Sequence, residues 1–85
     1  MNSSSVADTS PATVRVTGWR VGAQTVSAIQ AIREASRLEL ADTKGLVECV
    51  LAGVPVVVNV DNAASAQELV SVLGRLGFEA HLVGR

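Results

Sequence analysis

Two consecutive helices are predicted by residues 25–51, TVSAIQAIREASRLELADTKGLVECVL, and the other expected elements lie on either side of this pair. No glycine or proline interrupts residues 26–37, and Thr25 is a suitable cap for the start of the first helix. After the short connection 38–40, a second helix is expected over residues 41–51. A glycine and a proline follow it closely and end it.

The first of these helices carries two stripes of apolar residues. One stripe recurs at helical spacing and is expected to face the core; it consists of Ala28, Ile32 and Ala35. The other places Val26 and Ile29 beside Arg33, with Gln30 and Arg37 next to them. Two interpretations of this second stripe stay open. Val26 and Ile29 either lie buried under the neighbouring helix, or form a surface that binds a partner.

Three short strands are expected outside the helical pair. Residues 14–17 alternate apolar and polar side chains, as a half-buried strand does. Residues 56–60 are rich in β-branched side chains, and residues 78–82 alternate again near the end of the chain. The predicted order is therefore strand, helix, helix, strand, helix, strand, which is an α+β arrangement.

The third helix is predicted between the last two strands. Asn62 is a suitable cap for its start, and Ser65 followed by Glu68 offers a capping box at a slightly later start. The helix is expected to end at Leu76, with Gly77 at the position that favours a left-handed glycine. Its core stripe is expected to be Ala66, Leu69, Val70, Leu73 and Leu76.

Composition limits the classes of function. Seven basic and eight acidic residues nearly balance, so the chain lacks the electrostatic footprint of a nucleic-acid-binding protein. Nothing marks a membrane surface, a membrane span or a secretory leader. Residues 1–12 are rich in serine and predict a disordered tail, followed by one domain over residues 13–85. A single cysteine favours a reducing compartment, and we expect a cytoplasmic protein.

The sequence predicts neither a catalytic residue nor a metal ligand, and no cofactor. The one histidine, His81, is expected on the solvent side of the last strand, without clustered ligands around it. Cys49 is expected to be a small buried side chain within the second helix. Trp19 is expected in a loop that folds over the end of the sheet. We therefore do not expect an enzyme.

Several segments together resemble the C-terminal domain of the bacterial large-subunit ribosomal stalk protein, the acidic seven/twelve protein. The longest run is ungapped and contains AIQAIR (28–33), SRLEL (36–40) and TKGLVE (43–48). Downstream, PVV (55–57) and LGRLGFEA (73–80) are also similar to that family. The resemblance extends over nearly all of the expected domain.

The resemblance implies a βααβαβ fold, in which a three-stranded antiparallel sheet has three helices on one face. It also implies a non-enzymatic module that binds translational GTPases, including elongation factors Tu and G. The residues that correspond to the family's partner-binding patch are Val26, Ile29, Gln30, Arg33 and Lys44. At one of them, Gln30, the family has a lysine. The alternative is a free-standing adaptor on the same fold, similar to the ClpS protease adaptor, that acts outside translation.

Overall fold

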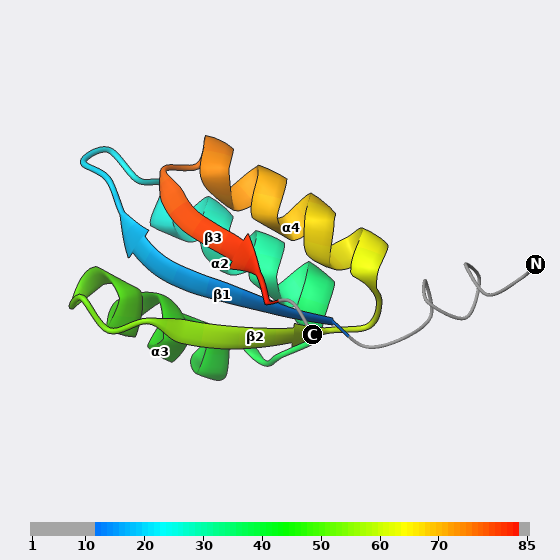
Figure 1. Cartoon of the computed structure of the whole chain (residues 1–85). Coiled ribbons are helices and arrows are strands. Elements are labelled where there is room, and N and C mark those ends of the chain that lie inside the picture. The colour runs from blue at the N-terminus through cyan, green and yellow to red at the C-terminus, as the bar shows by residue number, and fades with distance from the viewer. Residues whose placement is uncertain (1–11, 84–85) are drawn as a thin grey trace, which may run out of the picture.

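A computed structural model describes residues 12–83 and confirms the predicted order of elements (Figure 1). The elements are β1 (Ala12–Trp19), α2 (Thr25–Ser36), α3 (Leu40–Leu51), β2 (Val56–Val60), α4 (Ala63–Arg75) and β3 (Phe78–Leu82). The predicted tail lies outside the described residues except for Ala12, which is the first residue of β1 and so belongs to the domain.

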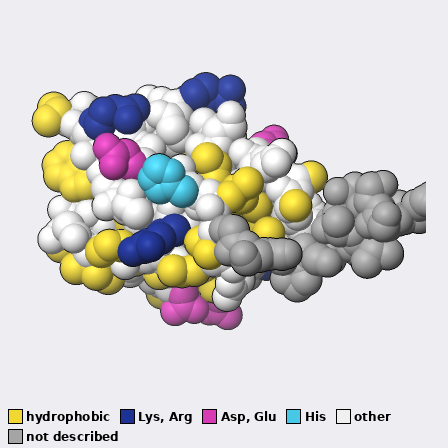
Figure 2. Space-filling model, in the orientation of Figure 1, with side chains coloured by type: hydrophobic (Ala, Val, Ile, Leu, Met, Phe, Trp, Pro, Cys, Tyr) yellow, Lys and Arg dark blue, Asp and Glu magenta, His cyan; other side chains and the backbone are white. Residues whose placement is uncertain are grey.

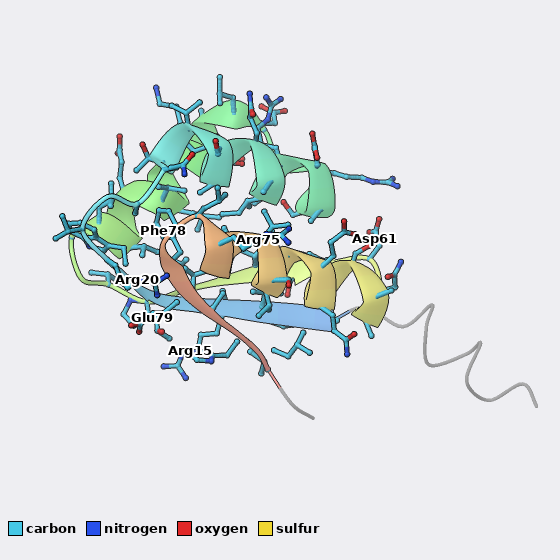
Figure 3. All side chains as sticks on the ribbon, turned by 90° about the horizontal axis from the view of Figure 1, so that it is seen from above. Arg15, Arg20, Asp61, Arg75, Phe78 and Glu79 are labelled. Atoms are coloured by element: carbon cyan, nitrogen blue, oxygen red, sulfur yellow. The ribbon has the colours of Figure 1, made fainter. Side chains whose placement is uncertain are left out.

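The strands form one antiparallel sheet in the order β2-β1-β3, so the first strand of the chain is the central one. All three helices cover one face of this sheet, which confirms the expected α+β class (Figure 1). The other face is open, and Arg15 in the centre of it projects away from the helices (Figure 3). Figure 2 shows this open face as a mixture of apolar, basic, acidic and histidine side chains.

The core lies between the sheet and the helices and is made almost entirely of aliphatic side chains. Val14 and Val16 of β1 and Val58 and Val60 of β2 point into it, because alternate residues of a strand share one face. The helices contribute Ala28, Ile32, Val47, Val50, Ala66, Leu69 and Leu73, and β3 contributes Phe78. The predicted stripe of the third helix is confirmed for Ala66, Leu69 and Leu73.

An irregularity in β1 changes the face on which its last residues lie. Val16 pairs with Ala80 and Gly18 pairs with Glu79, so Thr17 is an extra residue in the ladder, as in a β-bulge. After this shift Trp19 lies opposite the buried Phe78 and therefore on the helix side of the sheet. The expectation that Trp19 belongs to a loop was wrong, because the bulge lets the strand continue to this residue.

The helix ends differ in part from the predicted ones. Gln24, not Thr25, is the residue before α2, and it makes no side-chain capping bond. Asn62 does cap α4, since its Oδ1 accepts a hydrogen bond from the Ser65 N–H at 2.8 Å. A start at Ser65 is therefore wrong. Arg37, expected at the end of the first helix, instead has left-handed backbone angles of 64° and 22° after Ser36.

Two further positions test the sequence analysis. Gly77 directly follows Leu76, the C-cap residue of α4, and has a φ of +99°, which confirms the predicted left-handed glycine. Cys49 was expected to be buried and is exposed. The buried residues Val47 and Val50 of α3 place Cys49, two residues after the first of them, on the opposite side of the helix. This cysteine is therefore not part of the core.

Candidate protein-binding face

The exposed surface of α2 is a single stripe that combines one large apolar side chain with polar, basic and acidic ones, the acidic one being Glu34. Val26 is 69% exposed, and Gln30 and Arg33 follow it one and two helical turns later, both exposed. These residues lie on the side of the helix opposite the buried Ala28 and Ile32. The structure thus brings together three of the five predicted partner-binding residues on one helical face.

Ile29 lies at the boundary between this stripe and the core. It is only partly exposed, and it packs against the buried cluster. Val26 does not, although both residues were assigned to the same stripe from the sequence. Ile29 is therefore partly buried against the core, and Val26 is exposed.

Positive charge gathers at the C-terminal end of α2. Arg33 occupies its last turn, and Arg37 follows as its left-handed cap. The guanidinium of Arg37 lies 3.3 Å from the Asp61 carboxylate, in an exposed ion pair that ties this cap to the start of α4. Lys44 is exposed on α3, which packs directly against α2. Glu34, next to Arg33 on α2, is exposed as well, so this end of the helix also carries a negative charge.

A shallow open hollow lies at the C-terminal end of α2. It is bounded by Gln30, Arg33, Glu34, Arg37 and Leu38. Leu38 was assigned to the connection between helices, and the sequence analysis missed it as part of this surface. It lies between the charged Arg37 and Glu39 in a short connection, where no helical or strand periodicity distinguishes a surface leucine from a core one. We name Val26, Gln30, Arg33 and Lys44 the α2–α3 face.

The described residues were also searched for groups that could hold a metal ion and for membrane-spanning helices. No three histidine, cysteine or acidic side chains in residues 12–83 lie close enough together to hold a metal ion. His81 is exposed on the open face of the sheet, where it pairs across the strands with Arg15. The helices α2, α3 and α4 all fall short of the length and apolarity that crossing a bilayer requires.

No protein-family model matches the chain, and no curated protein matches it.

Proposed function

We propose that this chain is a non-enzymatic protein-interaction module that binds its partner through the α2–α3 face. The observation that carries this proposal is Val26, a large apolar side chain that is 69% exposed and has Arg33 two turns further along the same helix face. Arginine is enriched in binding hot spots, and Val26 would supply an apolar contact next to it.

The rest of the face supports a partner with an acidic surface. Arg33 and Arg37 stand at the end of α2, and Lys44 adds a third cation from the adjacent helix. A carboxylate on a partner helix would form a charge-assisted hydrogen bond with Arg33. Two helices fix the backbone that carries these groups, so little backbone entropy would be lost on binding.

The class of partner follows from the resemblance to the ribosomal stalk domain. We propose a cytoplasmic protein that binds translational GTPases, with elongation factors Tu and G as the first candidates. Gln30 replaces the lysine of that family, so one cation of the expected patch is missing here. The affinity for these factors is therefore expected to be lower than that of the stalk domain itself.

The test is a titration of the isotope-labelled protein with elongation factor G, followed by amide chemical shifts. Val26→Ala and Arg33→Ala should each weaken binding about tenfold, a change typical of hot-spot residues. Ile29→Ala is a poorer probe because this side chain also packs against the core.

The chain offers a matched control for each change. Val54→Ala removes a side chain that is 52% exposed, in the turn after α3 and away from the face. Arg75→Ala removes a cation from the last turn of α4, as Arg33→Ala does from the last turn of α2. Both controls should bind like the wild type. If the unchanged protein binds neither elongation factor, the translational proposal fails and the adaptor on the same fold takes its place.

A further inference from the structure

The backbone of β2 has hydrogen-bonding groups that face away from the sheet. The Val83 N–H donates to the Thr13 carbonyl at 2.9 Å, so the backbone groups of Thr13 face β3. Successive residues of a strand direct these groups to opposite sides, so those of Val14 face β2. Val14 pairs with Val58, and the backbone groups of Val58 therefore point back toward β1.

The same alternation gives the direction of the backbone N–H and C=O groups of the residues on either side of Val58. Val57 and Asn59 direct their N–H and C=O groups toward the free edge of β2. Within residues 12–83 no strand pairs with that edge. Exposed edges are usually protected by charges, by proline within the strand or by a bulge. The strand Val56–Val60, VVVNV, contains no charged residue and no proline, and Pro55 precedes it.

A hollow runs along this free edge, between β2 and the start of α3. Residues 57–59 form one wall. The other wall is formed by Ser36, Leu38, Asp42 and Leu46. Within this second wall, Leu38 and Leu46 are partly buried and form an apolar surface. Asp42 is exposed in the first turn of α3. The side chains of this wall therefore offer one apolar contact and one negative charge.

We propose that an extended segment of a partner protein adds to the free edge of β2 as a fourth strand. Its backbone would bond to Val57 and Asn59, as in other complexes in which a peptide extends a sheet. Of its side chains facing α3, one would be apolar and lie on Leu38 and Leu46. The next on that side, two residues away, would be basic and lie by Asp42, because side chains on one face of a strand recur every second residue.

This surface is separate from the α2–α3 face, and the inference does not depend on the proposed function. Charge complementarity selects the occupant, because Asp42 is the one charged side chain lining the hollow. The Arg37–Asp61 ion pair joins the end of α2 to the residue that follows β2.

The probes are two capped pentapeptides, Thr-Val-Thr-Lys-Thr and its reverse order, added separately to the isotope-labelled chain. We expect the amides of Val57 and Asn59 to shift, with a dissociation constant on the order of 1 mM for the better peptide. A peptide methylated on the nitrogen of its central threonine loses one backbone donor toward β2 and should bind about tenfold more weakly. This comparison leaves the protein unchanged, so no folding defect can explain its result.

The charge assignment is tested by exchanging charges across the groove. Asp42→Lys should weaken binding of the lysine peptide about fivefold and favour the matching peptide with glutamate in place of lysine. Arg75→Ala and Val54→Ala again serve as controls that should change neither affinity.

Three outcomes would overturn the proposal. The first is the absence of shifts in β2 at several millimolar peptide, and the second is equal binding of the methylated peptide. The third is a shift of the β2 amides with protein concentration alone, together with a dimer in sedimentation, which would show that a second copy of the chain pairs with this edge. An Asp42→Lys variant that keeps its preference for the lysine peptide would overturn the assignment of the basic residue.

Discussion

The indole N–H of Trp19 donates a hydrogen bond to the carbonyl of Leu51 at 3.2 Å, which joins the last residue of β1 to the last residue of α3. A carbonyl in the last turn of a helix has no partner within that helix. Trp19 supplies one here, although the two residues are far apart in the sequence. The bulge at Thr17 makes this contact possible, because it turns Trp19 to the helix side.

Replacing Trp19 with phenylalanine should lower the free energy of unfolding by about 1 kcal/mol, the usual net value of one hydrogen bond. The aromatic ring is largely kept, so packing changes little. Urea denaturation followed by far-ultraviolet circular dichroism measures the difference. Val21→Ala is the control, since this side chain is 97% exposed and its truncation should leave stability unchanged. A Trp19→Phe midpoint equal to that of the control would show that the bond contributes nothing.

Leu73 is completely buried, and its truncation to alanine should destabilise the domain by about 2–5 kcal/mol. The core has no large side chain nearby that is free to fill the cavity, since it consists mainly of valine and alanine. Leu82→Ala makes the same chemical change at a site that is 42% exposed and should cost clearly less. Thermal unfolding of both variants tests the prediction, and similar melting temperatures would contradict it.

Gly77 and Gly53 form a natural pair, because both have a positive φ but only one is crowded. A Cβ at Gly77 would lie 2.9 Å from the Cα of Ala23, whereas one at Gly53 would meet nothing within 4 Å. Alanine at either site would have to adopt the left-handed backbone conformation, which costs an L-residue about 1–2 kcal/mol. Gly77→Ala should cost about 1–3 kcal/mol more, because backbone must move to make room. Equal denaturation midpoints for the two variants would show that Ala23 moves freely.

Arg37 adopts a left-handed conformation that glycine adopts without strain. Arg37→Gly and Arg37→Ala both remove the exposed ion pair with Asp61. The difference between their free energies of unfolding therefore reports the cost of the left-handed backbone conformation at this position. We expect the glycine variant to be more stable than the alanine variant by about 1 kcal/mol. The two urea denaturation curves give this difference directly. An alanine variant as stable as the glycine variant would mean that the cap rearranges.

Gln30→Lys should strengthen binding to elongation factor G about threefold to fivefold, since it adds a cation to an exposed stripe that already holds Arg33. The effect should weaken at high salt, because the added contact is electrostatic and exposed. Gln67→Lys, at an exposed position on α4, adds the same charge elsewhere and should have little effect. If both variants gain equally, the improvement reflects net charge rather than the α2–α3 face.

The sequence by itself determined the features that depend on neighbouring residues. Its periodicities predicted all six elements in order, since alternation and helical spacing are properties of a single segment. Gly77 was predictable because only a local backbone angle is involved. The solvent position of His81 followed from alternation within β3. On the candidate face, helical spacing placed Val26, Ile29 and Arg33 on one stripe with Gln30 beside it, and Val26, Gln30 and Arg33 are exposed there.

Tertiary structure alone decided what depends on contacts between distant segments. The bulge at Thr17 exists only in the pairing of β1 with β3, so no pattern in β1 predicted that Trp19 would reach α3. Exposure of Cys49 depended on which side of α3 the sheet and α2 cover. Ile29 and Val26 are both apolar residues assigned to one stripe, but Ile29 packs against the core and Val26 is exposed, a difference that depends on contacts with other elements. The free edge of β2 arises in the same way, because the strand order is a choice among long-range pairings that no local pattern specifies.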